Sequence, residues 1–290
     1  MSAESVKPAV IVLSSHVARG AVGNRAIVFA LEKLGFPVWA VPTVLLPWHP
    51  GHGRATRIVP EAAQFSDLLA DLARSPRLGE VGAVLTGYFG DAGQIEAAAR
   101  LVDSVKAANP AATYLCDPVC GDSGGLYVAQ ETATALRNEM VPRSDIVTPN
   151  RFELAWLAGM PTETPQQAIA AAEALGRPLN AVTSAPALMA GGTGVLLVAD
   201  GQRLAIEHRA IDRAPNGPGD LFSALFLGRI LAGESREDAL RKATASAFEA
   251  LARASRRGAD ELMLAEDADC LAHPMAMVTL RRFAGPDRRA

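Results

Sequence analysis

The stretch APNGPGDLFSALF, residues 214–226, changes within a few positions from a tight turn to an apolar helix. Residues 215–219 hold two prolines, two glycines and Asn216, a composition typical of a constrained turn. An apolar run follows directly, so the free N–H groups and the positive dipole end of the predicted helix point back into the turn. Such a turn is suited to binding a phosphoryl group.

Asp220 is the first residue after this turn. A carboxylate beside a bound anion repels it, unless the carboxylate accepts a proton from a hydroxyl that attacks the anion. The alternative is that Asp220 caps the helix, which stabilises a helix by about 1 kcal/mol, and the turn alone favours neither. Because Pro218 has no N–H, an anion here would be bound by the amides of Gly217, Gly219 and Asp220.

Outward from this turn, short β-rich segments alternate with longer amphipathic ones. We predict strands at residues 9–13, 38–41, 83–86, 113–116, 146–148 and 181–183. We predict helices near residues 23–34, 61–74, 93–108, 152–157, 165–175, 220–231 and 236–254. Two further strands, residues 195–199 and 204–208, should form a hairpin through Asp200-Gly201. This alternation predicts an α/β sandwich with a central, mostly parallel sheet, helices on both faces and ligands at the carboxyl ends of the strands.

The composition excludes several classes of protein. The chain has 290 residues, 49% of them hydrophobic and 20% charged, so it is not disordered, and no linker-like segment divides it. A formal charge of −3 gives no support for nucleic-acid binding. The N-terminus shows no basic leader and only a short apolar run, so we expect no membrane span and a cytoplasmic location. The P-loop motif GxxxxGK[ST] is absent. The dinucleotide-binding motif GxGxxG is incomplete, because Phe222 replaces its last glycine.

Three cysteines are a sparse and odd set, as expected in a reducing compartment. Cys116 and Cys120 are separated by one residue too many for a CxxC motif, and no second pair completes a zinc site. His49 and His52 likewise lack a third ligand nearby. We therefore predict no structural zinc.

Two more runs place acids after predicted strands: residues 114–125 contain Asp117 and Asp122, and residues 146–153 end at Glu153. Each has a simple structural explanation, because turns are rich in Asp, Pro and Gly, and Glu suits a helix N-terminus. Together they place three acids beyond the carboxyl ends of parallel strands, where magnesium and nucleotide phosphates would bind in a kinase.

These runs, in this order, resemble the ribokinase-like superfamily and, within it, the pyridoxal kinases. The matching segments are residues 13–26, 85–88, 116–122, 148–153, 182–184 and 217–224. The combination of SHVxxGxVGN with TPNxFE is the most specific of them. The resemblance covers nearly the whole chain and implies a single ribokinase-like kinase domain, residues 1–290, folded as a three-layer sandwich.

The resemblance implies ATP-dependent phosphorylation of the 5′-hydroxymethyl group of pyridoxal, pyridoxine or pyridoxamine, with Mg²⁺, and with K⁺ as a further cation to consider. It implies a homodimer as well. Asp220 would be the base, the amides of Gly217 and Gly219 would bind the γ-phosphate, and Asp117 and Glu153 would organise the metal. The implied nucleotide-binding residues are Asp117, Asp122, Thr148, Asn150, Glu153, Thr183, Ser184, Asn216 and Pro218. The implied substrate-binding residues are Ser15, Val22, Trp48, His49, Pro50, Tyr88 and Asp220.

The segment VLLPWHPGHG, residues 44–53, departs from the family pattern. Leu45 replaces a usual Gln and Pro50 a usual Thr, and a buried ligand group left without its hydrogen-bond partner costs about 1–3 kcal/mol. Trp48 could compensate by stacking on a flat ring. The changed loop motivates an alternative substrate such as hydroxymethylpyrimidine, and the loop together with Pro218 motivates a low-turnover vitamer-binding protein.

Overall fold

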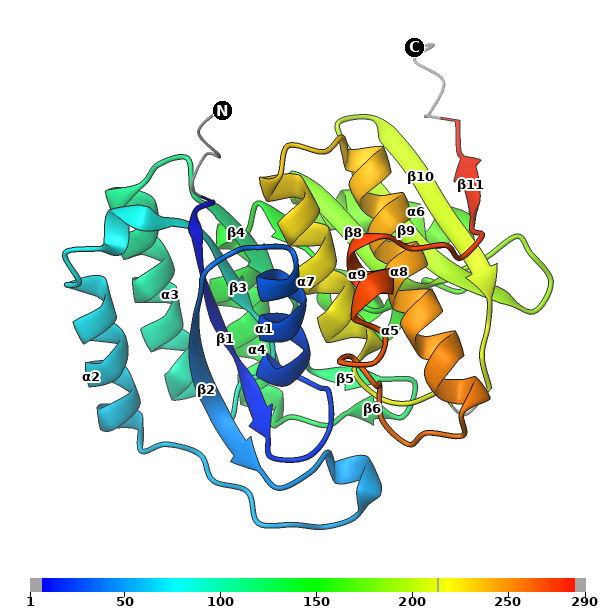
Figure 1. The fold of residues 1–290 in the computed structure, drawn as a ribbon. Helices are drawn as coiled ribbons and strands as arrows, with labels where there is room; N and C mark the ends of the chain where they lie inside the picture. The colour runs from blue at the N-terminus through cyan, green and yellow to red at the C-terminus, as the bar shows by residue number, and fades with distance from the viewer. Residues whose placement is uncertain (1–6, 213, 285–290) are drawn as a thin grey trace, which may run out of the picture.

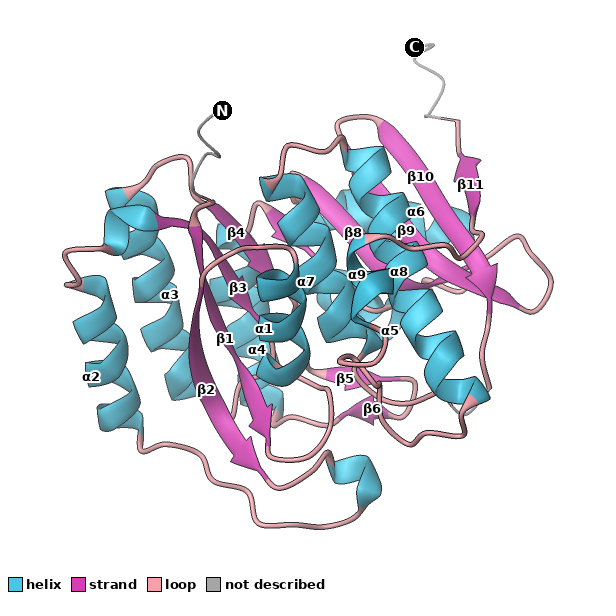
Figure 2. Ribbon diagram, viewed as in Figure 1, coloured by secondary structure: helices cyan, strands magenta, loops and turns pink. Residues whose placement is uncertain are grey.

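The computed structural model describes residues 7–212 and 214–284. Its centre is a nine-stranded sheet with strand order β11-β10-β9-β8-β7-β4-β3-β1-β2 and helices on both faces (Figures 1 and 2). The strands are β1 (Ala9–Val17), β2 (Val38–Leu46), β3 (Val81–Thr86), β4 (Thr113–Cys116), β7 (Ile146–Val147), β8 (Leu179–Pro186), β9 (Gly192–Ala199), β10 (Gln202–Arg209) and β11 (Thr279–Arg282). A separate small ribbon pairs β5 (Gly121–Asp122) with β6 (Gly125–Leu126).

The strands from β2 to β8 are parallel to one another, whereas β9, β10 and β11 extend the sheet by antiparallel pairing. The predicted mostly parallel sheet and the β9–β10 hairpin are therefore confirmed. β11 was not predicted. It completes the edge beside β10, where Arg281 Nε lies 3.2 Å from the carboxylate of the buried Glu207.

Helices cover the two faces in separate groups. One face carries α1 (Asn24–Lys33), α7 (Pro218–Leu231), α8 (Arg236–Arg256) and α9 (Ala268–Ala272). The other carries α2 (Ala62–Ala73), α3 (Ala92–Ala108), α4 (Gln130–Ala135), α5 (Arg151–Ala158) and α6 (Pro165–Leu175). Short turns of other helix types are η1 (Pro50–His52), η2 (Leu78–Glu80), η3 (Leu136–Met140) and η4 (Val141–Arg143).

The alternation of side chains along β1 explains these layers. Val10 and Val12 pack into the core beneath α1 and α7, while Ile11 and Leu13 pack into the core on the opposite face. All four are fully buried. Both faces of β1 are therefore covered, as expected when parallel strands are connected by helices.

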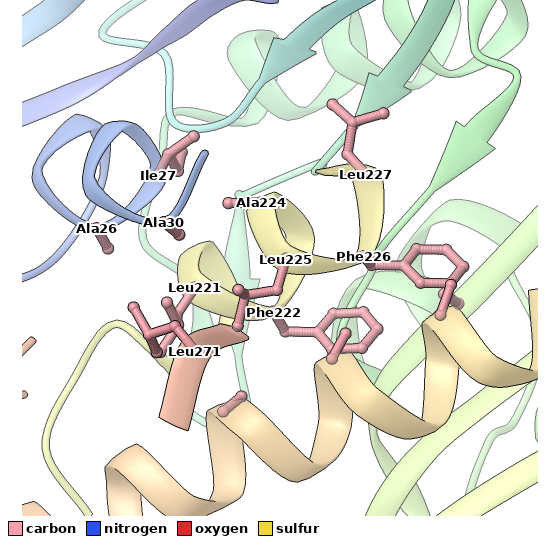
Figure 3. Close-up of a cluster of buried hydrophobic side chains, with 14 of the residues drawn as sticks. Ala26, Ile27, Ala30, Leu221, Phe222, Ala224, Leu225, Phe226, Leu227 and Leu271 are labelled. Carbon is pink, nitrogen blue, oxygen red and sulfur yellow. The ribbon is translucent and has the colours of Figure 1, made fainter. Parts of the chain in front are cut away.

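Helix α7 is buried over most of its length, which explains why its sequence is apolar on every side. Its Leu221 and Leu225 lie in the same cluster as Ile27 of α1, and Phe222 stacks on Phe226 with ring centroids 5.5 Å apart (Figure 3). The helix is thus packed into the core immediately after the turn at residues 214–219. This packing fixes the direction in which the helix N-terminus points.

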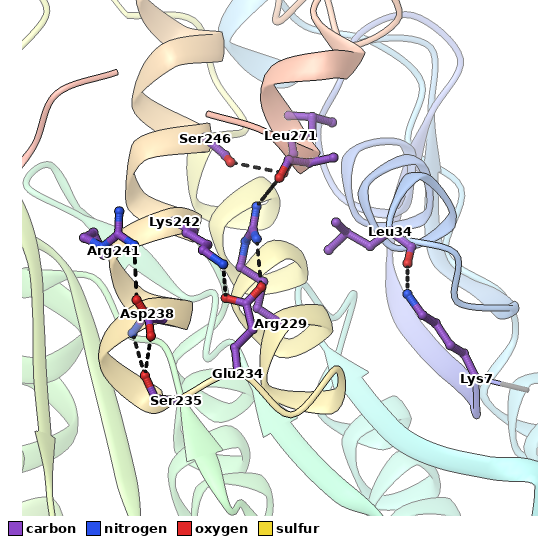
Figure 4. Close-up of polar contacts among 11 residues, drawn as sticks. Lys7, Leu34, Arg229, Glu234, Ser235, Asp238, Arg241, Lys242, Ser246 and Leu271 are labelled. Atoms are coloured by element: carbon purple, nitrogen blue, oxygen red, sulfur yellow. Dashed lines mark hydrogen bonds and ion pairs between the residues drawn. The ribbon is translucent and has the colours of Figure 1, made fainter. Parts of the chain in front are cut away.

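The other end of α7 is anchored by Arg229, which is buried. Its guanidinium donates to Leu271 O at 2.8 Å and to Glu234 Oε1 at 3.2 Å, and Lys242 lies 3.1 Å from the second oxygen of Glu234 (Figure 4). Ser246 Oγ donates to the same Leu271 carbonyl. These contacts join α7, α8 and α9 into one packed unit.

All three cysteines are free and buried in the described part of the chain. None of the helices within residues 7–212 and 214–284 has the length and apolar character needed to cross a membrane.

Candidate active site

The predicted motifs meet at the carboxyl ends of the parallel strands, because neighbouring strands end in register. The amide of Asp117, just after β4, donates to Thr86 O at the end of β3 at 2.8 Å. The amide of Thr148, just after β7, donates to Cys116 O at 3.0 Å. Thr183 of β8 donates in turn to Pro149 O at 2.9 Å. The strand ends therefore form one continuous edge.

The turn before α7 presents free amides. Gly217 is the N-cap residue with φ +97°, and a Cβ there would lie 2.2 Å from Ala21 O, so only glycine fits. Among the described groups, none accepts a hydrogen bond from the amides of Gly217, Gly219 or Asp220. A Cβ on Gly219 would meet no atom within 4 Å. The turn thus combines three unpartnered N–H groups with open space at a helix N-terminus, a combination suited to binding an anion.

The carboxylate of Asp220 is held across this turn rather than used as a helix cap. Its Oδ2 accepts a hydrogen bond from Gly23 N at 2.9 Å, and α7 has no side-chain cap. Its Oδ1 lies 3.9 Å from the position that a Cβ on Gly87, after β3, would occupy. Burial raises the pKa of Asp220 to about 6. This carboxyl group can therefore exchange a proton near neutral pH.

Asp117 lies beside it and is 5% exposed. Burial, and then the charges of Glu153 and Asp220, hold the pKa of Asp117 well above its usual range. Ser223 Oγ donates to Asp117 Oδ2 at 3.0 Å and lies 2.9 Å from Thr148 Oγ1, which makes Thr148 the donor in that second contact. Sequence reasoning missed Ser223, although its position three residues after Asp220 places both on one face of α7.

Glu153 and Asn150 form a capping box at the start of α5. Glu153 Oε1 accepts from Cys120 N at 2.9 Å and Glu153 Oε2 from Asn150 N at 2.8 Å. Burial raises the pKa of Glu153 to about 7, although these amide hydrogen bonds act in the opposite direction. Because both oxygens already accept hydrogen bonds, Glu153 shapes the loop after β4 and can act on a cation through water.

The donor set suits Mg²⁺ better than a metal enclosed by protein ligands. In the described chain, no group of three or more His, Cys, Asp or Glu side chains is arranged to hold a metal ion. Mg²⁺ usually keeps several waters and binds one or two carboxylates together with substrate phosphates. Burial is the first cause of the raised pKa of Asp117, and the negative charges of Glu153 and Asp220 come next; a bound cation would offset these charges. Asp117, with Glu153 behind it, therefore fits a Mg²⁺ that binds together with a nucleotide.

The remaining predicted nucleotide-binding residues lie along the same edge. Asp122 is exposed on β5 and accepts from Gly124 N at 2.8 Å. Ser184 is exposed on β8 with φ +50°, an uncommon conformation for a residue with a side chain. Asn216 and Pro218 belong to the anion turn, where Pro218 is the first residue of α7.

Three of the predicted substrate-binding residues are Ser15 on β1, Val22 before α1 and Tyr88 after β3. Ser15 of β1 is 8% exposed and Val22 is 5% exposed, and Val22 Cγ1 would be 3.2 Å from a Cβ on Gly217. Tyr88 follows β3, and its hydroxyl accepts from Arg57 at 3.3 Å. Arg57, which no motif indicated, also donates to Gly90 O at 2.9 Å. Arg57 is thereby held beside Tyr88, one of the predicted substrate-binding residues.

The changed loop lies next to the anion turn. His49 Nδ1 accepts from Gly51 N at 3.1 Å, and a Cβ on Gly51 would be 3.3 Å from Asn216 Nδ2. Burial lowers the pKa of His49. Trp48 is 36% exposed and donates its indole N–H to Gly53 O at 3.2 Å, and Pro50 is exposed at the start of η1. The loop is thus a closed turn whose outer face is formed by Trp48 and Pro50.

A mostly parallel sheet, a free anion turn and acids at the strand ends define a small-molecule kinase of the ribokinase-like class. The chain belongs to the phosphomethylpyrimidine kinase family, which residues 63–264 match. It is 39% identical to a pyridoxal kinase of Rubrobacter xylanophilus over 95% of this chain and 97% of that protein. It is 38% identical to a pyridoxine/pyridoxal/pyridoxamine kinase of Bordetella bronchiseptica over 88% of this chain and 93% of that protein.

Solved structures agree with these sequence relatives. The pyridoxal kinase of Leishmania donovani in complex with ADP and pyridoxine superposes with a TM-score of 0.88 at 26% identity, covering 95% of this chain and 99% of that one. The complex of the same enzyme with ADP and pyridoxamine gives a TM-score of 0.89. The resemblance to pyridoxal kinases that the motifs indicated is confirmed, and so is the ribokinase-like fold.

Proposed function

We propose that the protein transfers the γ-phosphoryl group of ATP to the 5′-hydroxymethyl group of pyridoxal, pyridoxine or pyridoxamine, so that pyridoxal yields pyridoxal 5′-phosphate in vitamin B6 salvage. The observation that carries this proposal is that the carboxylate of Asp220 belongs to the same turn as three amides without a hydrogen-bond partner. Relatives named as pyridoxal kinases match nearly the full length of the chain. A protein that only bound the vitamer would have little need for a base at this position.

In the proposed reaction, Asp220 takes the proton of the substrate hydroxyl while the hydroxyl oxygen attacks the γ-phosphorus and the bond to ADP breaks. The amides of Gly217, Gly219 and Asp220 stabilise the negative charge that develops on the transferred group. Mg²⁺ neutralises charge on the nucleotide phosphates when bound. Asp117 would hold this cation, and Ser223 keeps the Asp117 carboxylate oriented.

The activity should depend on pH through Asp220. A base must be ionised, and the pKa of Asp220 is raised to about 6, so kcat/KM for pyridoxal should fall as the pH drops below that value. Steady-state rates from about pH 5 to pH 8 test this. The residual activity of Asp220→Asn should not show this fall at low pH. The variant therefore distinguishes Asp220 from Glu153, whose pKa is raised to about 7 and which could cause a similar fall. A profile that is flat through this range would contradict the assignment.

The decisive test of the function is ADP release with Mg-ATP and a panel of pyridoxal, pyridoxine, pyridoxamine and hydroxymethylpyrimidine. Hydroxymethylpyrimidine is included because Leu45 and Pro50 lack the polar groups usual in the vitamer loop and because the matched family is described as phosphomethylpyrimidine kinase. Turnover on a vitamer supports the proposal. Turnover on hydroxymethylpyrimidine alone would show that this compound, and not a vitamer, is the substrate. Binding of pyridoxal without any turnover would show that the protein binds the vitamer but is not a kinase for it.

Replacing Pro50 by Thr should lower KM for pyridoxal by about three-fold to ten-fold, the effect of restoring one hydrogen bond. Pro50 is exposed at the start of η1, where Thr is sterically possible. The measurement is KM for pyridoxal with the KM for ATP as the internal control. An unchanged or higher KM for pyridoxal would show that the loop serves a different ligand.

The proposal includes four further expectations. We expect Mg²⁺ at Asp117 and Glu153, a single kinase domain over residues 1–290, a homodimer and a cytoplasmic location. K⁺ is a candidate second cation. Sedimentation of the purified protein tests the dimer, and rates with K⁺ replaced by tetramethylammonium test the monovalent cation.

A further inference from the structure

Glu261 lies in the segment after α8, outside every motif of the sequence, and is 8% exposed. Its Oε1 is 2.8 Å from His52 Nε2, and its Oε2 accepts from Ala21 N at 3.4 Å. Its backbone forms a parallel bridge with that of Asn216. One residue therefore joins the loop at residues 48–53, the segment before α1 and the anion turn.

The chain is shaped around this carboxylate. A Cβ on Gly20 would lie 2.5 Å from Glu261 Oε1, and Gly20 has φ +111°, so a side chain at that position would displace the carboxylate. The side chains of His52 and Glu261 are 23% and 11% exposed. A charged group this shielded from water is stable only when it is paired and hydrogen-bonded. Within the described residues, His52 is the side chain that forms an ion pair with Glu261.

We propose that Glu261 is a positioning residue for the vitamer, which it serves by holding His52 and thus the loop at residues 48–53 against the anion turn. The close packing of Gly51 on Asn216 shows how near the loop is to that turn. This inference rests on the proposed function, in which the loop contacts the substrate ring. We assign uniform binding to the contacts of this loop with the ring: contacts that act equally on bound substrate and transition state set KM and leave kcat unchanged.

The test is a double-mutant cycle with Glu261→Gln and His52→Gln. Each single variant should raise KM for pyridoxal by about ten-fold, because it weakens the contact between residues 52 and 261, and hydrogen bonds to a charged group are roughly twice as strong as neutral ones. Both should keep kcat and KM for ATP within about two-fold of the parent. The double variant should be no worse than either single one, because both substitutions weaken the same contact. Additive effects, an unchanged KM for pyridoxal or a fall in kcat alone would overturn the proposal.

A matched control lies next to this pair. Arg19 and Asp260 form an ion pair at 2.8 Å between side chains that are 56% and 58% exposed, and exposed pairs contribute little. Asp260→Asn should leave KM for pyridoxal unchanged. The same rise in KM with Asp260→Asn would mean that any loosening of the segment after α8 has this effect, and the specific role of Glu261 would be lost.

Hydrogen exchange separates this inference from the proposed function. In the free protein, Glu261→Gln should speed amide exchange in residues 48–53, and Asp260→Asn should not. This readout needs no turnover. If the parent protein phosphorylates none of the substrates, the proposed function fails while the exchange experiment still tests the contact. Unchanged exchange in Glu261→Gln would show that Glu261 does not hold the loop.

Discussion

Replacing Asp220 by Asn should lower kcat with the preferred vitamer by about 100-fold or more, the usual contribution of general-base catalysis. Asn keeps the size of the side chain and can still accept the hydrogen bond from Gly23 N, so the turn should keep its shape. ADP binding measured by calorimetry should be close to that of the parent. Near-normal turnover would remove Asp220 from the chemistry.

The same substitution should leave thermal stability at neutral pH unchanged or higher. A carboxyl group whose pKa is raised by folding, here from 3.8 to about 6, binds its proton more tightly in the folded state. Its contribution to stability is present at low pH and is lost as the pH rises through that interval. At pH 7 the ionised carboxylate therefore lowers the stability of the folded state, and Asn, which is uncharged, removes this unfavourable contribution.

Asp238→Asn is the matched control, because Asp238 is also the third residue of a helix. It accepts hydrogen bonds from Ser235 and Arg241 at the start of α8, and these contacts lower its pKa. Its contribution to stability is present above its unfolded pKa, so the control should lose a little thermal stability at neutral pH and keep full turnover. A loss of stability in Asp220→Asn like that in Asp238→Asn would favour a structural role for Asp220.

Gly217→Ala should reduce turnover by about 100-fold or more and lower the free energy of unfolding by about 1–3 kcal/mol. With φ +97°, Gly217 has a conformation that Ala rarely adopts, and the new methyl group would lie 2.2 Å from Ala21 O. The turn must shift to relieve this overlap, and its amides shift with it. Kinetics and denaturant unfolding measure the two effects.

Two other glycines separate the two effects of Gly217→Ala. Gly233, at the far end of α7, has φ +80° and open space around it, so Gly233→Ala should cost stability but not turnover. Gly219→Ala should gain about 0.4–1 kcal/mol of stability, because Gly219 is helical and unobstructed. It should still lose turnover, since its methyl group would occupy space needed by the phosphate. Full turnover in Gly219→Ala would show that the phosphate does not approach this turn.

The mostly parallel character of the sheet and the hairpin at its antiparallel side could be predicted from local sequence signals. Alternating strands and helices predicted a mostly parallel sheet, and the glycine-rich turn before an apolar helix predicted an anion site beside Asp220. The hairpin at Asp200-Gly201 followed from its turn residues, and β9 and β10 extend on either side of it. These features depend on residues close together in the chain, whose conformational preferences act without the rest of the fold.

Only the tertiary structure decided which distant groups meet. Asp220 takes its hydrogen bond from Gly23, 197 residues away, and Ser223 meets Asp117 across 106 residues. The contact between His52 and Glu261 spans 209 residues and lies outside any motif. Such pairs depend on how the helices pack on the sheet and on the register of neighbouring strands, which no local pattern encodes. The sequence by itself therefore determined the fold class and indicated the candidate acids, while packing determined the partners of these acids, because a partner's position is set by the whole core.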